Sequence, residues 1–199
     1  MIIGLTGGIA CGKSTVAAML VARGAALVDA DQVAREVVMP GEAALSAVVR
    51  QFGQAVLADD GTLDRPALGQ LVFGDREKLK TLEAILHPAI RERMQDRLRR
   101  YEAEDPARLA VADIPLLYET GQADLYQGVL VVYVPQSLQL ERLLARSPEM
   151  TEEQARSRIA LQMDIEEKRR RADWVIDNSG TLYETELQVE AFLREAVAR

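Results

Sequence analysis

Apolar residues along the chain form two patterns, short continuous runs and longer segments in which they recur at helical spacing. Short apolar runs bounded by turn residues are typical of strands buried in a parallel sheet. Such runs occupy residues 2–6, 26–29, 109–114, 128–134 and 174–176. Because helical patterns lie between them, we predict an α/β fold, a doubly wound parallel sheet of about five strands flanked by helices.

Two helix starts are marked by polar residues. Thr151 is followed three residues later by Gln154, and Thr181 is followed by Glu184, which is the spacing of a capping box. These boxes predict helices over 151–171 and from about 182 to 198.

A stretch of roughly seventy residues without a clear strand separates the second and third predicted strands, more than a crossover connection needs. Turn signals at Pro40-Gly41, Asp60-Gly61 and Pro88 divide it. Its apolar residues share helical faces in two groups, Leu68, Leu71 and Val72, and then Leu79, Leu82, Ile85 and Leu86. We therefore predict one domain with a helical insertion over 31–106 that covers a phosphate acceptor. The core of this domain is predicted at 1–30, 107–136 and 172–199.

Basic side chains are concentrated in residues 137–171, which we predict to be a helical lid whose first helix covers 137–146. Neighbouring glutamates favour a solvated, salt-bridged face for residues 169–171. For Arg156 this interpretation and a functional one are equally open. A lid over phosphates needs guanidinium groups that offset transition-state charge. The residues that favour this role are Arg142, Arg146 and Arg158.

Composition narrows the class of protein. The 199 residues, 48% of them hydrophobic, are enough for one domain with a sizeable core. A formal net charge of -7 argues against a general nucleic-acid binder, which needs surplus Lys and Arg. Cys11 is the single cysteine, so no intrachain disulfide can form, and the longest apolar run is too short to span a bilayer. We expect a cytoplasmic protein with no membrane or nucleic-acid partner.

The segment GGIACGKS at residues 7–14 directly follows the first apolar run and matches the GxxxxGKS pattern of a phosphate-binding loop. In such a loop backbone N–H groups turn toward phosphate oxygens, and the dipole of the following helix favours the anion. Lys13 would reach the β- and γ-phosphates, and Ser14 would ligand Mg²⁺. The alternative is a glycine-rich turn that only solves a packing problem. The residues predicted to bind the triphosphate here are Gly8, Ala10, Cys11, Gly12, Lys13, Ser14 and Thr15.

Several segments together resemble the dephospho-coenzyme A kinases, a family of P-loop kinases. They are IGLTGGIACGKS at 3–14, VDADQVAREVV at 28–38, LHPAI at 86–90, DIPLLYE at 113–119 and ADWVIDNSG at 172–180. The resemblance covers nearly the full chain. It implies ATP-dependent phosphorylation of the ribose 3′-hydroxyl of dephospho-coenzyme A, the last step of coenzyme A synthesis, with ATP and Mg²⁺ as the implied substrate and metal.

The resemblance also implies roles for single residues. Asp31 resembles the catalytic base of the family, and its position after the second strand suits a group that accepts a proton from a hydroxyl. Asp29 is a rival for this role, and the alternative for Asp31 is a helix N-cap. Arg142 resembles the phosphate-facing arginine that begins the lid. Asn178 resembles a residue of the adenine-side loop, with a plain turn as the alternative.

Further residues complete the predicted site. Asp113 ends an apolar run, which is the pattern of an acidic residue that holds Mg²⁺ in many P-loop enzymes, with a capped turn as the alternative. His87 precedes Pro88, which by itself predicts a residue at a helix junction. The resemblance implies instead that His87 faces the acceptor nucleotide. The residues predicted to contact the acceptor are Thr6, Asp31, His87, Leu117 and Tyr118. For Leu117 and Tyr118 a place in the core is the alternative.

The sequence departs from the family pattern at three positions. Ala10 stands where glycine is usual, and a positive φ there would cost about 1–2 kcal/mol. Asp164 stands where proline is common, which predicts a different lid hinge. Cys11 is predicted at a helix N-terminus, where its thiolate would be favoured, or else serves as a small residue.

Two other functions stay open at this point. A different small-molecule or nucleotide kinase would share the phosphate loop and the arginine lid. A nucleotide switch is less favoured, because no NKxD segment that reads a guanine base is present. The sequence carries no indication of the oligomeric state.

Overall fold

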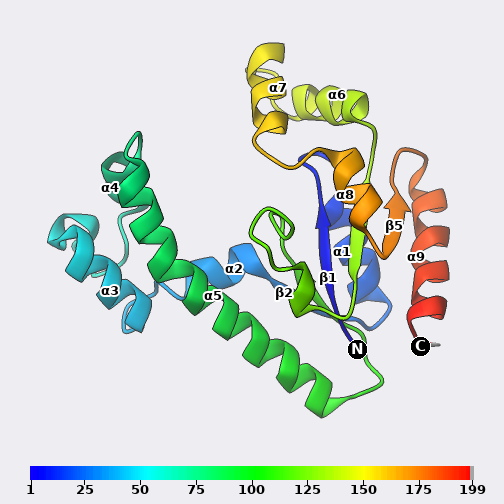
Figure 1. Cartoon of the computed structure of the whole chain (residues 1–199), viewed down its shortest axis with the longest axis horizontal. Coiled ribbons are helices and arrows are strands. Elements are labelled where there is room, and N and C mark those ends of the chain that lie inside the picture. The colour runs from blue at the N-terminus through cyan, green and yellow to red at the C-terminus, as the bar shows by residue number, and fades with distance from the viewer. Residues whose placement is uncertain (198–199) are drawn as a thin grey trace. The chain divides into compact units, whose positions relative to one another are not determined.

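The structure is a computed structural model that describes residues 1–197, and its elements are labelled in Figure 1. The strands are β1 (Ile2–Gly7), β2 (Ala26–Asp29), β3 (Ala110–Asp113), β4 (Val129–Tyr133) and β5 (Trp174–Asp177). The helices are α1 (Lys13–Ala22), α2 (Ala30–Glu36), α3 (Ala43–Phe52), α4 (Arg65–Val72), α5 (Arg76–Glu104), α6 (Gln136–Arg146), α7 (Glu152–Ala160), α8 (Ile165–Arg171) and α9 (Leu182–Val197). Two 3₁₀ turns, η1 (Gln54–Val56) and η2 (Ala123–Leu125), complete the order. The predicted parallel α/β fold is confirmed.

The strand order of the sheet is β2-β3-β1-β4-β5. β1 pairs in parallel with β3, where Leu5 lies opposite Asp113, and with β4, where Thr6 lies opposite Val131. The chain leaves β1 toward one side of the sheet and leaves β3 toward the other. Ligands of open α/β sheets bind at such a switch, outside the carboxyl ends of the strands. The phosphate loop follows β1, and Asp113 is the last residue of β3.

The chain divides into two compact units, and the second unit contains residues Asp29–Arg97. The first unit contains Met1–Val28 and the chain from Leu98 onward. Its strands are buried on both faces, with Ile3, Leu5 and Leu130 fully inaccessible to solvent. Here α1 packs against α9, α9 lies beside β5, and α8 packs on β4 (Figure 1). This packing of helices on a buried sheet fixes the strand ends that carry the site.

The second unit folds around a small apolar cluster. Its buried members are Val48, Val56, Leu68 and Leu82. Ile85 and Leu86 of α5 pack against this cluster, as their shared helical face predicts. Leu71 and Leu79 differ from that prediction, because they are 37% and 43% exposed.

The prediction that a helix ends at His87 and Pro88 is wrong, since both residues lie inside α5. A proline inside a helix removes one backbone hydrogen bond and costs about 3 kcal/mol. Leu82, Ile85 and Leu86 of α5, which precede Pro88, pack into the cluster of the second unit. Tertiary packing therefore outweighs the local preference of the His-Pro pair.

The predicted helix over 151–171 is instead two helices, α7 and α8. Residues 161–164 leave the helical conformation, and the carboxylate of Asp164 accepts hydrogen bonds from the N–H groups of Glu166 and Glu167. Asp164 is thus the N-cap of α8, which is the physical reason for the break. The capping box at Thr151 is confirmed.

The start of the last helix is confirmed as well. Reciprocal hydrogen bonds join Thr181 and Glu184, and α9 begins at Leu182. Residue 198, where this helix was predicted to end, lies outside the described residues. Among residues 1–197, none of the helices combines the length and apolar content that crossing a bilayer requires.

Candidate active site

The phosphate loop adopts the conformation that its sequence predicts. Ala10 has φ 61° and Gly12 has φ 81°, so two residues of the loop are left-handed. Such residues turn successive N–H groups toward one concave side, which makes an anion-binding nest. α1 begins at Lys13, with glycine at the N-cap and no acidic residue in its first turn. Its positive helix end is therefore left for an anion.

Close neighbours require glycine at Gly8 and at Gly12, and Gly12 also has a left-handed conformation. A Cβ on Gly8 would lie 2.2 Å from Nε2 of Gln139, and a Cβ on Gly12 would lie 2.2 Å from Nδ2 of Asn178. Both neighbours are buried amide side chains. The loop is thus held by side chains that approach its backbone closely.

Asn178, which follows β5, braces the loop. Its side-chain amide donates to the carbonyl of Cys11 at 2.8 Å, and its side-chain oxygen accepts from the hydroxyl of Thr185 at 2.8 Å. Its backbone carbonyl accepts from Arg142 at 2.9 Å. Both polar ends of this side chain are therefore engaged within the protein, and its contact with a nucleotide stays a prediction.

The side-chain ammonium of Lys13 forms an ion pair with the carboxylate of Asp113. The two side chains are 20% and 7% exposed. The pair joins the start of α1 to the carboxyl end of β3, so the structure brings together these two predicted site residues. The predicted alternative of a capped turn at Asp113 does not account for this long-range pairing.

The residues near this pair fit Mg²⁺. The hydroxyl of Ser14 and the carboxylate of Asp113 are hard oxygen donors of the kind that Mg²⁺ prefers. Within residues 1–197 no cluster of three or more His, Cys, Asp or Glu side chains could hold a metal ion. A sparse donor set suits Mg²⁺, which typically binds through one or two protein carboxylates together with substrate phosphates.

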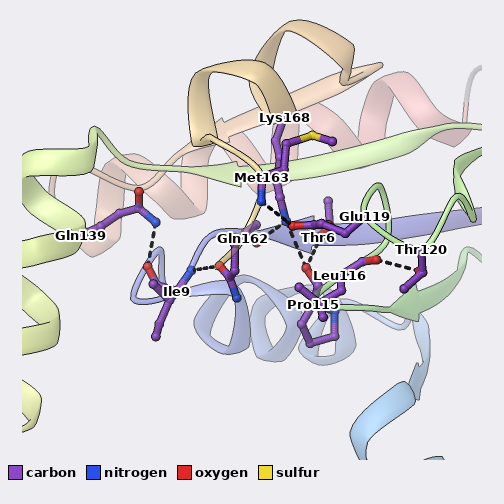
Figure 2. A network of polar contacts seen from close by, with 11 residues as sticks. Thr6, Ile9, Pro115, Leu116, Glu119, Thr120, Gln139, Gln162, Met163 and Lys168 are labelled. Atoms are coloured by element: carbon purple, nitrogen blue, oxygen red, sulfur yellow. Dashed lines mark hydrogen bonds and ion pairs between the residues drawn. The ribbon is translucent and has the colours of Figure 1, made fainter. Parts of the chain in front are cut away.

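Two glutamines of the lid region hold the peptide groups of Ile9. Gln162, between α7 and α8, accepts from the N–H of Ile9 at 2.7 Å, and Gln139 of α6 donates to the carbonyl of Ile9 at 2.8 Å (Figure 2). Gln139 is 2% exposed, and its side-chain oxygen has no hydrogen-bond partner among the described residues. Both glutamines line a cavity of about 240 Å³. Sequence reasoning missed them, because isolated glutamines carry no motif.

Lys168 is the second residue that sequence reasoning missed. It belongs to a run of four basic residues, yet its side chain is fully buried while the following three arginines are exposed. Its ammonium donates to the carbonyls of Gly7 and Pro115, both at 3.1 Å, and pairs with Glu119 at 2.9 Å. One signal was available, since Lys168 lies one helical turn after the buried Ile165 and shares its face.

The lid arginines fall into two groups. Arg142 is half-buried and reaches the loop region through Asn178, whereas Arg146 and Arg158 are exposed. Arg156 pairs with Glu152 at 2.7 Å, and Arg171 pairs with Glu167 at 2.7 Å. Arg169 and Arg170 also pair with glutamates of α8. The salt-bridged face predicted for 169–171 is confirmed, and Arg156 follows the same pattern.

Three residues predicted to contact the acceptor lie in the first unit, namely Thr6, Leu117 and Tyr118. Thr6 is fully buried and its hydroxyl donates to the carbonyl of Pro115 at 3.0 Å. Leu117 is fully buried against Gly4, where a Cβ would lie 2.4 Å from Leu117. Leu117 is thus a core residue, which was the alternative. Acceptor contacts by Thr6 and Leu117 stay predictions, and neither side chain is exposed to solvent.

The hydroxyl of Tyr118 is also buried, with no hydrogen-bond partner among residues 1–197. Burial raises the pKa of Tyr118 to about 12, with a further contribution from the negative charge of Asp173 that Arg171 partly offsets. Asp173 precedes β5 at the amino edge of the sheet, whereas the phosphate loop follows the carboxyl edge. The burial of this hydroxyl agrees with the core alternative, and its contact with the acceptor stays a prediction.

The expectation of a reactive thiolate at Cys11 is wrong. The side chain is fully buried, and this burial raises the pKa of the Cys11 thiol. Backbone hydrogen bonds from Gly8 and Val134 and the charges of Lys168 and Arg142 oppose the rise without cancelling it. Cys11 therefore acts as a small buried residue, which was the alternative.

The remaining predicted residues lie in the second unit. Asp29 is the N-cap of α2, because its carboxylate accepts from the N–H groups of Asp31 at 2.7 Å and Gln32 at 3.3 Å. The alternative that Asp31 caps this helix is thus wrong, and Asp31 is an exposed residue of the first turn. His87 is half-buried within α5. The approach of Asp31 and His87 to the phosphate loop stays a prediction.

A parallel sheet with a GxxxxGKS loop after its central strand and an acidic residue at the end of the adjacent strand defines a P-loop kinase. The family model for dephospho-CoA kinase matches residues 1–184. The chain belongs to the dephospho-CoA kinase family. Enzymes of this family catalyse the last step of coenzyme A biosynthesis, so the predicted activity is confirmed.

Individual relatives agree with this assignment. A dephospho-CoA kinase of Shouchella clausii is 50% identical over 189 residues, which cover 95% of each chain. A crystal structure from Thermus thermophilus is 41% identical, has a TM-score of 0.80 and covers 98% of this chain and 97% of its own. A dephospho-CoA kinase structure from Campylobacter jejuni is 29% identical, with a TM-score of 0.76 and coverage of 99% and 97%.

Proposed function

We propose that this kinase transfers the γ-phosphoryl group of ATP directly to the ribose 3′-hydroxyl of dephospho-coenzyme A, without a covalent enzyme intermediate. The observation that carries this proposal is the left-handed phosphate loop, whose Lys13 pairs with Asp113 at the carboxyl ends of β1 and β3. Catalysis then depends on positioning and on offsetting charge.

The backbone N–H groups of residues 8–15 bind the phosphates, and Lys13 reaches the β- and γ-phosphates when ATP is bound. Ser14 and Asp113 would hold Mg²⁺. When bound, the metal would offset the negative charge of the phosphates. Arg142 offsets the charge on the transferred group, with Arg146 and Arg158 as further lid cations that help exclude water.

Asp31 orients the acceptor hydroxyl and accepts its proton. The hydrogen bonds that Asp29 accepts support this choice, because they commit Asp29 to capping α2. Asp31 is exposed at the first turn of the same helix and keeps its carboxylate for the substrate. The helical insertion, with His87 on α5, forms the acceptor side.

The cellular setting is part of the same proposal. The single cysteine, which allows no intrachain disulfide, supports a cytoplasmic location. The acceptor is a small molecule with a single nucleoside, and the net charge of -7 does not favour a nucleic-acid partner. Nucleic-acid binding is not expected, because that activity depends on surplus basic charge.

The test is a coupled assay with ATP, Mg²⁺ and dephospho-coenzyme A, in which mass and the site of phosphorylation identify the product. Phosphorylation at a hydroxyl other than the ribose 3′-hydroxyl would contradict the proposal. Asp31→Asn should lower kcat by about 10²–10⁴-fold, since general-base catalysis contributes that much. The matched control Asp29→Asn keeps a side-chain oxygen that can cap α2 and should leave kcat near the parent value. A rate for Asp31→Asn within a few fold of the parent would remove Asp31 from the catalytic role.

A further inference from the structure

Lys168 is a buried cation whose hydrogen-bonding capacity is fully used. A lysine ammonium has three donors. The three acceptors are the carbonyl of Gly7, the carbonyl of Pro115 and the carboxylate of Glu119. Burial of a charge costs free energy unless the charge is paired and hydrogen-bonded. Lys168 of α8 is fully buried, and its partners come from β1 and from the segment after β3.

The two carbonyls belong to the strand ends that carry the chemistry. Gly7 is the last residue of β1 and opens the phosphate loop. Pro115 lies two residues after Asp113, and its carbonyl also accepts from Thr6 of β1. Figure 2 shows Lys168 descending from α8 toward Pro115, Thr6 and Glu119. One ammonium group therefore fixes the end of β1 relative to the segment that follows β3.

The carboxylate of Glu119 extends this connection to the lid. It accepts from the N–H of Met163 at 2.8 Å, in the linker between α7 and α8. The preceding residue of the linker, Gln162, binds the N–H of Ile9 in the phosphate loop (Figure 2). The linker is thus fastened at neighbouring residues to the loop and to the ion pair of Lys168.

We propose that Lys168 is a positioning residue for phosphoryl transfer. It holds the phosphate loop and the segment after Asp113 at a fixed separation and fastens the α7–α8 linker to them, without touching ATP. This inference rests on the proposed function. Displacement of reacting groups by about 1 Å can lower a rate by roughly 10²-fold, so a residue that sets this separation affects turnover more than binding.

Lys168→Met keeps the aliphatic stem and removes the three donors. We expect kcat to fall by about 10–100-fold at saturating substrates, while KM for ATP and for dephospho-coenzyme A changes by less than threefold. The matched control is Arg23→Met, which breaks ion pairs to Glu186 and Glu190 beyond the other end of α1. This control should lower Tm and leave kcat within twofold of the parent.

A double variant separates positioning from stability. In Lys168→Met the charge of Glu119 loses its cation, so adding Glu119→Gln should restore part of the lost Tm. The link that the ammonium makes between the carbonyls of Gly7 and Pro115 is still missing, and kcat should therefore stay low. Recovery of kcat together with Tm would overturn the proposal, as would a kcat for Lys168→Met within threefold of the parent.

If Lys168→Met does not fold, the double variant Lys168→Met/Glu119→Gln is measured against the same kcat criteria, because it also lacks the three donors but buries no unpaired carboxylate. Failure of this inference is distinguishable from failure of the proposed function. The unmodified chain must phosphorylate dephospho-coenzyme A for the function to hold. An active parent with an equally active Lys168 variant would overturn only the positioning role.

Discussion

The phosphate-loop end of the first unit and the helical second unit use polar residues in opposite ways. Around the loop, Lys168, Asn178 and Gln139 are buried and bind backbone carbonyls of the loop or of the strand before it. In the second unit the prominent ion pairs, Arg93 with Glu42 and Arg97 with Glu36, are about one-third exposed. The loop is thus fixed through its backbone, whereas the second unit is stabilised mainly by its apolar cluster.

This difference matches the two tasks of a kinase. Transfer of a phosphoryl group requires donors that are in place before the transition state forms. The acceptor-binding role proposed for the second unit requires it to bind and release a substrate, and a small core with solvent-exposed ion pairs suits that task. Substitutions around the loop should therefore change turnover, and substitutions in the cluster should change stability and acceptor affinity.

The largest expected effect is on turnover. Lys13→Met removes the cation that pairs with Asp113 and should lower kcat, per mole of folded protein, by about 10²–10³-fold. Steady-state assays beside circular dichroism spectra separate this loss from unfolding. Lys80→Met, at an exposed pair with Glu77, is the control and should match the parent. Turnover of Lys13→Met within threefold of the parent would contradict the assignment of the loop.

The next effect is on the second unit. Leu82→Ala leaves a cavity in the cluster of Val48, Val56 and Leu68 and should cost about 2–5 kcal/mol of stability. Hydrogen exchange in residues 43–72 should accelerate, and KM for dephospho-coenzyme A should rise, while the Kd of ATP measured by calorimetry stays unchanged. A weaker Kd for ATP would show that the cluster also supports the first unit.

A smaller effect of opposite sign is expected in the loop. Ala10 has φ 61°, which costs about 1–2 kcal/mol in a residue with a Cβ. Ala10→Gly removes that strain but adds chain entropy and loses a methyl that packs beside Leu143 and Ala155. The net gain should be about 0.5–1 kcal/mol, seen as a Tm increase of about 2–4 °C at most. Ala18→Gly, at an exposed position of α1, should lower Tm instead; a lower Tm for Ala10→Gly would contradict the strain.

Prediction from the sequence succeeded where local pattern determines the structure. Continuous apolar runs predicted the five strands, and the capping boxes predicted two helix starts, because both depend on residues close in the chain. A left-handed Ala10 was predicted only as a condition, based on the glycine that is usual at this position in the family, and the structure shows φ 61° there. The helix break at 161–164 was missed. It depends on capping by Asp164, and a helical pattern can also contain an aspartate at such a position.

Burial of polar side chains could not be predicted in the same way. Lys168 resembles its exposed neighbours in sequence, and its burial depends on acceptors that lie 161 and 53 residues away. The same reason applies to Gln139, whose partner Ile9 is 130 residues away. For Cys11 the helix N-terminus favours a thiolate, but burial contributed by other segments outweighs that local effect.

A still smaller effect is expected at Tyr118, on the first-unit side of the comparison. Tyr118→Phe removes a buried hydroxyl that has no hydrogen-bond partner among the described residues. Stability should be unchanged or higher by up to about 1 kcal/mol, because no satisfied bond is lost. KM for dephospho-coenzyme A should stay within twofold of the parent. A larger increase in KM would restore the acceptor contact predicted from the sequence.

The smallest effect concerns acid stability of the second unit. A hydrogen bond from Arg97 lowers the pKa of Glu36 below its ordinary value, against an opposing effect of burial. A carboxyl whose folded pKa is lowered stabilises the fold above its unfolded pKa, and this contribution is lost as pH falls through the folded pKa. Between pH 7 and pH 3.5 the urea midpoint should therefore fall slightly less in Glu36→Gln than in the parent. The control Glu77→Gln should follow the parent, because Lys80 and Glu77 of that pair are 71% and 84% exposed. Addition of 1 M NaCl should reduce the difference between Glu36→Gln and the parent, because the Glu36 pair is partly exposed. Equal pH dependence of Glu36→Gln and the parent would show that the Glu36–Arg97 pair contributes no stability to this unit.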